Sequence, residues 1–412
     1  MDTKQKSGIH EFLTARRAAQ FAFLAEMIRQ PSENPPGDCS RVFACLFERL
    51  SVLGFSVRRY PEPDEGVDAG DKGLANLVVR QEFGDGPTIA LVASGDTATI
   101  GPGWTRDPFG AEIDDGKMYG RGVVASKGVI AAYVYALLAL RDQADGLKGA
   151  VELHITFDSQ TGGDLGCRWL LANKLVAPDL AIASGTTYSL TTAATGCLLL
   201  EVEIKGRSAP ASLPESGIDT LEAAARVMMA IYSHRKDYSK IRSKVKGIGS
   251  PSIVISQVQG GESPRSVAGR TLINIDRRLI PGEDPTRVEN ELTTLIGTSV
   301  VQVPGVLCKV RRKGLSQAMV PHKGTAKLVE AFQRHAQDIL GAPLETGGTP
   351  LDTDGRHYSN AGIPTVLYGV GPKNPGEANI SGPDEVLSLD GLRRSTELLT
   401  VVLSDLLLAG ED

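Results

Sequence analysis

Two stretches of the sequence decide the fold class: PTIALVASGD, residues 87–96, and AVELHITFDSQTGGD, residues 150–164. Each is an apolar run that ends in small polar residues, which is typical of a buried strand running to its carboxyl end. Between them, the apolar residues 128–140 predict a long helix, and residues 180–183 predict a further strand. Strands that alternate with helices indicate an α/β fold with a mainly parallel sheet.

The sequence pattern changes near residue 193 and changes back after residue 313. The segment between them predicts, in order, a strand, a helix, two strands, a helix and a strand, at residues 198–205, 220–232, 252–258, 270–279, 284–296 and 299–309. This order is typical of a small ferredoxin-like α+β sandwich. We therefore expect an α/β domain made of residues 1–192 and 314–412, with a lid domain, residues 193–313, inserted into it.

The composition excludes several classes of protein. The 412-residue chain has 44 Lys and Arg against 49 Asp and Glu, a net charge of −5, which disfavours non-specific nucleic-acid binding. Long uninterrupted apolar runs are missing, and the N-terminus has no apolar core, so we expect neither a membrane span nor a signal peptide. Five widely spaced cysteines without a CxxC pair favour a reducing, cytoplasmic location over a disulfide framework.

An ordered series of motifs runs along the chain. The motifs are PSENPPGD (31–38), DPFGAEIDDGKMYGRG (107–122), SKG (126–128), DSQTGGDLG (158–166), KGRSAPASLPESGIDTLEAA (205–224), GGESPRSVAG (260–269), INIDRRLIPGED (273–284), TDGRHYSNAGIPTVLYGVG (353–371) and ISGPDEV (380–386). In this order they resemble the M20 family of zinc amidohydrolases, which includes acetylornithine deacetylase, succinyl-diaminopimelate desuccinylase, aminoacylase and carboxypeptidase G2. The resemblance covers nearly the whole chain. It implies a zinc-peptidase-like catalytic domain, an inserted lid and a homodimer formed through the lid.

The resemblance also implies two zinc ions held by His, Asp and Glu at five places, and this sequence departs from the family at each of them. The strand-end motif that begins with His in the family begins with Ser94 here, and only Asp96 remains of it. The bridging aspartate aligns with Ala125. The glutamate pair, a catalytic base followed by a metal ligand, aligns with Ser159 and Gln160.

The remaining positions of the family's metal centre and lid have changed as well. The next acidic ligand aligns with Ser184 and the last histidine with Ser381, while the lid histidine and lid asparagine align with Pro210 and Arg265. The six histidines all lie away from the ligand positions: His10, His154, His234, His322, His335 and His357. Because hydroxyls and a neutral amide are poor zinc ligands, we expect no family-type metal site and no cofactor.

Parts of an anion-binding site are retained. Arg356 matches the family arginine that contacts the substrate carboxylate, and Arg278 matches an arginine of the lid. A guanidinium suits a carboxylate because it can donate two parallel hydrogen bonds. Gly369 matches the backbone wall beside the substrate, and His357 directly follows Arg356. The alternative is that both arginines form ordinary structural ion pairs.

Seven side chains would line the former metal cavity: Ser94, Asp96, Ser126, Ser159, Gln160, Ser184 and Ser381. Three of them are candidate catalytic groups. Ser126 precedes Lys127, although adjacent side chains often point apart; Ser159 stands where the catalytic base should be. Asp96 would act as a general base if burial raised its pKa. The alternatives are that Ser159 only fills vacated space and that Asp96 is hydrogen-bonded to nearby backbone amides.

Three functional hypotheses remain open at this point. The first is a metal-independent enzyme that acts on an N-acyl amino acid, a dipeptide-like molecule or a related carboxylate by hydrolysis, acyl transfer, cyclisation or isomerisation. The second is an inactive homologue that binds a small carboxylate ligand or regulates an active relative through the lid. The third is a zinc hydrolase with rearranged ligands. The retained arginines favour the first, and the lost metal positions favour the second.

Overall fold

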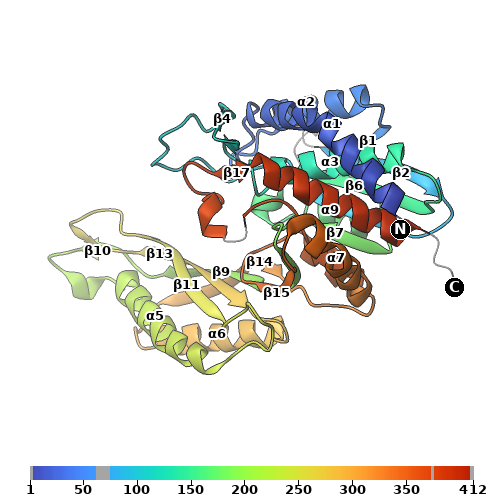
Figure 1. The fold of residues 1–412 in the computed structure, drawn as a ribbon. Coiled ribbons are helices and arrows are strands. Elements are labelled where there is room, and N and C mark those ends of the chain that lie inside the picture. The colour runs from blue at the N-terminus through green and yellow to red at the C-terminus, as the bar shows by residue number, and fades with distance from the viewer. Residues whose placement is uncertain (1–2, 62–74, 373–374, 409–412) are drawn as a thin grey trace. The chain divides into compact units, whose positions relative to one another are not determined.

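The computed structural model describes residues 3–61, 75–372 and 375–408, and it divides the chain into two compact units (Figure 1). Unit 1 comprises Met1–Thr192, Pro321–Thr346 and Thr353–Asp412; unit 2, the lid, comprises Ala193–Val320 and Gly347–Asp352. The first division falls where the sequence pattern changes. The second lies at residue 320 rather than 313, and the chain re-enters unit 2 for a short stretch at residues 347–352.

The central sheet of the structure is mainly parallel in its middle, as the sequence predicts. Its strands lie in the order β1 (Val57–Pro61), β2 (Ala75–Gly84), β6 (Gly149–Thr156), β3 (Thr88–Ser94), β7 (Leu180–Ala183), β16 (Thr365–Leu367), β8 (Ser189–Ala194) and β15 (Glu345–Thr349). β3 pairs in parallel with β6 and β7, and β7 with β16, whereas β1, β2 and β8 pair antiparallel with their neighbours. The carboxyl ends of the parallel strands therefore share one edge.

Helices cover this sheet. They are α1 (Thr3–Ile28), α2 (Ser40–Val52), α3 (Lys127–Asp142), α4 (Cys167–Ala172), α7 (Thr325–Leu340), α8 (Gly355–Asn360) and α9 (Leu389–Leu407). The two ends of the chain meet here, because α1 and α9 both pack against α3 (Figure 1). α3 is buried from Lys127 to Leu140, which explains why it is apolar on every side.

A buried carboxylate, Glu385, fastens the two sequence segments of unit 1 together. It lies just before β17 (Val386–Ser388), which pairs with β5 (Lys117–Tyr119), and β5 pairs with β4 (Glu112–Asp114). Glu385 accepts hydrogen bonds from Arg121 Nη1 at 3.2 Å and from the backbone N–H groups of Gly122 at 3.1 Å and Val124 at 2.9 Å. Arg121 and Glu385 are both 1% exposed, so this ion pair is fully buried.

The lid is a four-stranded antiparallel sheet with two helices. Its strands lie in the order β11 (Ser252–Gly260), β13 (Arg270–Leu279), β9 (Gly196–Lys205) and β14 (Leu307–Ser316), with α5 (Thr220–Arg235) and α6 (Pro285–Val300) packed together beside it. The chain order β9-α5-β11-β13-α6-β14 confirms the predicted β-α-β-β-α-β arrangement. Buried and partly buried residues alternate along β13, as expected for a strand with one face on a core.

The predicted strand at residues 299–309 is wrong in its position. α6 continues to Val300, and the strand begins only at Leu307. The helix extends because Val288, Leu292, Ile296 and Val300 are buried at helical spacing on its inner face.

The described parts of the chain include no helix long and apolar enough to cross a membrane.

The buried ion pair gives a test of the fold. Glu385→Ala leaves Arg121 and two backbone donors without their acceptor, so we expect the free energy of unfolding to fall by about 3–5 kcal/mol. Glu385→Gln keeps a neutral acceptor, so its free energy of unfolding should lie between those of the parent chain and Glu385→Ala. Glu291→Ala removes half of an exposed ion pair with Arg287 and should change the value by less than about 1 kcal/mol. If urea unfolding gave equal losses of unfolding free energy for Glu385→Ala and Glu291→Ala, the stabilising role of the buried ion pair would be contradicted.

Candidate functional site

Polar side chains follow three neighbouring strands at the carboxyl edge of the central sheet. Ser94 is the last residue of β3, and the next residue, Gly95, donates its backbone N–H to Thr156 at the end of β6 at 2.8 Å. Ser184 follows β7 and donates its backbone N–H to Val92 of β3 at 3.0 Å. These bonds hold the strand ends together, so the predicted residues that follow the strands gather at one edge.

Asp96 is fully buried and closes the turn that follows β6. Its carboxylate accepts the backbone N–H groups of Ser159 at 3.2 Å and Gln160 at 2.9 Å, and the side-chain amide of Asn34 at 3.2 Å. Burial raises the pKa of Asp96 to about 6, with a further contribution from the charge of Asp354. Both oxygens are therefore committed to holding the turn, as in the backbone-amide alternative, while the carboxyl group titrates close to neutrality.

The turn held by Asp96 is a short 3-10 helix, Ser159–Thr161, with an exposed Gln160 and a half-buried Ser159. The carboxylate of Asp96 reaches Ser159 through the backbone amide rather than through the side-chain hydroxyl. The structure thus brings Asp96, Ser159 and Gln160 together as predicted. Ser159 as a nucleophile remains a prediction.

Asp158 lies beneath the same turn and is 5% exposed. Its Oδ2 accepts the backbone N–H groups of Leu165 at 2.7 Å and Gly166 at 3.0 Å, whereas its buried Oδ1 has no hydrogen-bond partner in the described structure. Burial raises the pKa of Asp158 to about 7, and the negative charges of Asp354 and Asp96 add to the shift. The sequence analysis did not single out Asp158 or Asp354 as candidate site residues.

Arg356 and His357 of α8 also bind the turn, through the carbonyl oxygen of Gly162. The guanidinium of Arg356, 2% exposed, donates to the carbonyl of Thr353 at 2.7 Å and to that of Gly162. His357 Nε2 lies 2.9 Å from the same Gly162 oxygen. Burial, with the charge of Arg356, lowers the pKa of His357, so the ring is neutral at pH 7 and Nε2 carries the proton that it donates. A substrate-binding role for either residue remains a prediction.

The side chains of Ser126 and Lys127, considered as a candidate catalytic pair, do not bond to each other. Ser126 Oγ is buried and has no hydrogen-bond partner in the described structure, so it forms no bond with Lys127. Lys127 Nζ instead donates to the carbonyl of Gln30 at 2.7 Å, and burial lowers the pKa of this amine to about 7. Ala125, at the position of the family's bridging aspartate, is exposed.

The other predicted residues of this edge have different surroundings. Ser184 Oγ donates to the carbonyl of Val92 at 3.2 Å, and Ser381 is exposed with a φ of 60°. Gly369 packs directly on Gly185, because a Cβ at Gly369 would lie 2.4 Å from the Gly185 carbonyl oxygen. Its glycine is thus required by close backbone packing, and its place beside a ligand remains a prediction.

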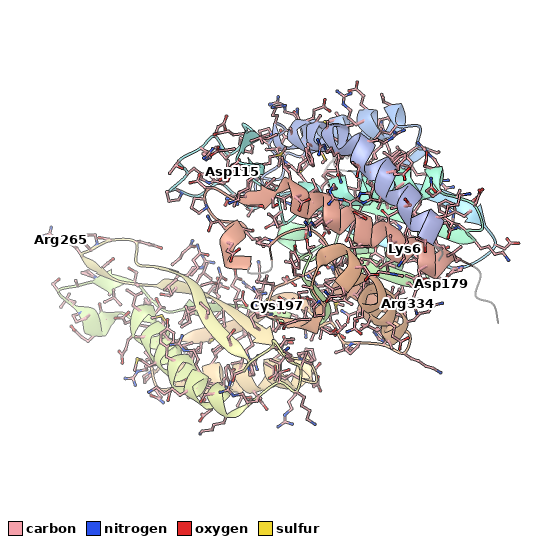
Figure 2. All side chains as sticks on the ribbon, in the orientation of Figure 1. Lys6, Asp115, Asp179, Cys197, Arg265 and Arg334 are labelled. Atoms are coloured by element: carbon pink, nitrogen blue, oxygen red, sulfur yellow. The ribbon has the colours of Figure 1, made fainter. Side chains whose placement is uncertain are left out.

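The lid residues are described within the lid alone. Arg278, predicted to bind substrate, forms an ion pair with Asp276 at 2.9 Å. Pro210 pairs with Ser266 in a short two-stranded sheet formed by β10 (Ala209–Pro210) and β12 (Ser266–Val267). Arg265, at the position of the family's lid asparagine, is exposed near one end of the lid (Figure 2).

Sequence reasoning missed a buried polar column behind the turn. His154, noted in the sequence as lying away from the metal-ligand positions, is a core histidine hydrogen-bonded to Glu152 and Tyr358. The available signal was the alternation of Glu152, His154 and Thr156 along an otherwise apolar strand, which places three polar side chains on one face.

The described residues contain no group of three or more His, Cys, Asp or Glu side chains arranged to hold a metal ion.

Comparison with known proteins assigns the family. The sequence profile described as Peptidase family M20/M25/M40 matches residues 93–405, which is most of the chain. The chain belongs to this peptidase family. Acetylornithine deacetylase from Myxococcus xanthus is 28% identical over 332 residues, which span 78% of this chain and 82% of that protein.

Solved structures confirm the family fold. The dipeptidase Dug1p from Saccharomyces cerevisiae superposes with a TM-score of 0.79 at 14% identity, over 98% of this chain and 99% of that one. Human carnosine dipeptidase 1 gives a TM-score of 0.75 at 15% identity, over 98% and 99%. A tripeptidase from Staphylococcus aureus gives 0.72 at 20% identity, over 95% and 98%. At these identities the likeness concerns the M20 fold alone.

The raised pKa of Asp158 predicts how this residue changes stability with pH. Its pKa is about 7 in the folded chain and 3.8 ordinarily, so the unfolded chain ionises first. The contribution of Asp158 to the free energy of unfolding should therefore be complete below pH 4 and decline as the pH rises to about 7. Asp158→Asn removes this decline, because the amide does not ionise. Its oxygen can still accept the two N–H bonds from Leu165 and Gly166.

The measurement is the difference in unfolding free energy between Asp158→Asn and the parent chain, taken at pH 5 and pH 8. We expect the difference to shift in favour of the variant at pH 8. Asp164→Asn is the matched control, since Asp164 lies on the same loop but is exposed and paired with Arg168. An equal difference at the two pH values for Asp158→Asn would show that its carboxyl group is not held protonated.

Proposed function

We propose that this member of the M20 family works without the family's dizinc centre. The positions that hold metal in the resemblance carry Ser94, Ala125, Gln160, Ser184 and Ser381, which offer hydroxyls, a methyl group and an amide. Zinc sites of proteins are built from thiolate, imidazole and carboxylate ligands, so this donor set does not fit a dizinc ion pair.

Asp96 is what remains of the family motif at the end of β3, and in the resemblance this aspartate supports the lost histidine rather than binding metal. It now accepts hydrogen bonds from two backbone amides and from Asn34. The donor set at the five aligned ligand positions is the observation that supports the metal-independent proposal.

The proposed activity is acid–base chemistry on a small carboxylate ligand, such as an N-acyl amino acid or a dipeptide-like molecule. Asp96 and Asp158 have pKa values of about 6 and 7, the range in which a carboxyl group can both donate and accept a proton at neutral pH. The exposed Gln160 and half-buried Ser159 supply polar contacts above them. Arg356 binds the carbonyl of Gly162 in the same turn.

The second candidate is a ligand-binding or regulatory homologue without turnover. It is favoured by the missing bond between Ser126 Oγ and Lys127, since a serine nucleophile needs a base within hydrogen-bond reach. The two candidates share the ligand class and differ in whether the bound molecule is converted.

Metal content is the first test. Protein produced with added zinc and then dialysed should retain well under one zinc ion per chain, and a chelator should leave its Tm unchanged. A zinc-containing member of the family, treated in parallel, is the control. Two zinc ions per chain, or a Tm that falls on chelation, would overturn the metal-independent proposal and favour rearranged ligands.

Turnover is the second test. With a panel of N-acetyl and N-succinyl amino acids and dipeptides, we expect conversion that a chelator does not affect. Asp96→Asn should lower kcat/KM about 100-fold or more, because it removes the proton-transfer group. Asp164→Asn, on the exposed part of the same loop, should leave it unchanged. A raised Tm with these ligands but no conversion would contradict the enzyme and support the binding protein.

We also propose that the lid forms a homodimer through β11. This strand is an edge of the lid sheet, so its outer N–H and C=O groups are free to pair with another strand. Val254 and Val258 of β11 are 51% and 42% exposed, and Met229 of the adjacent α5 is 69% exposed. Exposed apolar side chains beside an open strand edge suit a second copy of the same edge.

The dimer is tested by mass measurement in solution with chromatographic separation. The parent chain should elute as a dimer, and Val254→Glu should be a monomer because it places like charges at the new interface. Val301→Glu, the same change at an exposed valine after α6, is the matched control and should remain dimeric. A monomeric parent chain at micromolar concentration would refute the proposal.

A further inference from the structure

The strand β6 carries a row of polar side chains where a buried strand normally carries apolar ones. Glu152, His154 and Thr156 alternate along it, and their exposures are 8%, 0% and 0%. Burying polar groups is costly unless each finds a hydrogen-bond partner. The zinc-free site described above does not use them, so their presence needs a separate explanation.

Glu152 and His154 belong to one hydrogen-bonded relay, Arg80–Glu152–His154–Tyr358, whereas Thr156 pairs with the Cys167 thiol. Arg80 Nη1 lies 2.7 Å from Glu152 Oε1, and Glu152 Oε2 lies 2.9 Å from His154 Nε2. His154 Nδ1 lies 2.6 Å from the hydroxyl of Tyr358, and the two rings lie nearly parallel, with centroids 5.9 Å apart. Arg80, in β2, is the half-buried outer end of the relay, and Tyr358 is its fully buried inner end.

The partners fix the direction of each hydrogen bond. Burial alone would raise the pKa of Glu152, but hydrogen bonds from His154 and Arg80 hold it below its ordinary value, so Glu152 is an anion and only accepts. His154 Nε2 must then carry a proton and donate it to Glu152. Burial raises the pKa of Tyr358 well above its ordinary value, so its hydroxyl keeps its proton and is able to donate it to His154 Nδ1.

A carboxylate, an imidazole and a hydroxyl in this order also occur in nucleophilic triads. That reading fails here, because His154 and Tyr358 are both fully buried and a substrate cannot reach the phenol oxygen. The relay therefore acts through what Tyr358 is attached to. Tyr358 belongs to α8, the short helix that also carries Arg356 and His357, whose side chains hold the carbonyl of Gly162.

α8 is held by its surroundings rather than by its own backbone: it contacts α4, β7 and β16, and His322 Nε2 lies 2.6 Å from the carbonyl oxygen of Ser359. It is six residues long, too short to be stable by its own backbone hydrogen bonds. The charge of its neighbour Asp354 contributes to the raised pKa of both Asp96 and Asp158, so a displacement of α8 would also alter these two pKa values. A directional bond from the rigid middle of β6 to Tyr358 resists such a displacement.

We propose that Glu152, His154 and Tyr358 are positioning residues that lock α8 against the turn at residues 158–163 and thereby set the geometry of the candidate site. The inference rests on the proposed function only for the use of that site. The lock itself can be measured on the free protein, so failure to find a ligand or a reaction leaves its test intact.

The test compares two tyrosine variants by hydrogen–deuterium exchange. Tyr358→Phe removes the phenol oxygen and nothing else. Tyr133→Phe is the matched control, because Tyr133 is also fully buried and its hydroxyl makes one hydrogen bond of the same 2.6 Å length, to the carbonyl of Tyr368. Tyr133→Phe loses one buried hydrogen bond, and Tyr358→Phe loses the bond to His154 together with a weaker one to the Cys167 thiol, so both variants should have a Tm lower by a few degrees.

Their exchange patterns should differ. Tyr358→Phe should speed exchange several-fold in peptides covering residues 158–166 and 353–363, whereas Tyr133→Phe should leave both at the parent rate. A second variant tests whether the relay acts as a unit: in a His154→Leu background, Tyr358→Phe should lower the Tm further by much less than it does alone.

Parent-like exchange of both segments in Tyr358→Phe would overturn the proposal, as would equal effects of the two tyrosine variants on them. Fully additive Tm losses for His154→Leu and Tyr358→Phe would also overturn it, since independent residues do not form a relay. If Tyr358→Phe does not fold, Glu152→Gln keeps an acceptor for His154 and gives the same comparison in a milder form.

Discussion

The buried carboxylate of Glu385 joins two parts of the chain that lie far apart in sequence. It is 264 positions from Arg121, and it also binds backbone amides of the turn that leads into α3. That turn decides which side chains face outward: Ala125 is exposed, while Ser126 and Lys127 are buried. The candidate site can therefore form only when the C-terminal segment has returned to the N-terminal one, which makes unit 1 a single folding unit despite the inserted lid.

A second set of hydrogen bonds fixes the turn at the strand ends. Asp96 holds the turn after β6 from one side, and Arg356 with His357 holds it from the other. Several carboxylates facing one another would repel and be costly to bury. Asp96 and Asp158 have raised pKa values and accept hydrogen bonds from backbone donors, which help to give the turn a defined shape.

The sequence predicts the architecture well, because apolar periodicity is a local property. Buried strands, the apolar α3 and the β-α-β-β-α-β lid all follow from it, and the alternative role of Asp96 as an acid bound to amides agrees with its hydrogen bonds. Local patterns fail where a distant partner decides. Arg356 is turned toward Gly162, 194 residues away, and His154 bonds to Tyr358 across 204 residues. The end of α6 was missed because Val300 continues a helical face into β-rich sequence.

The turn at residues 158–163 is the point at which the functional alternatives meet. An enzyme needs Asp96 and Asp158 at fixed separation from a ligand, and a binding protein needs the same turn to give the ligand a complementary surface. In both cases a mobile turn would bind the ligand more weakly, because part of the binding free energy would be used to order the turn. A polar column buried in β6 and bonded to α8, whose side chains bind this turn, would limit that mobility in either function.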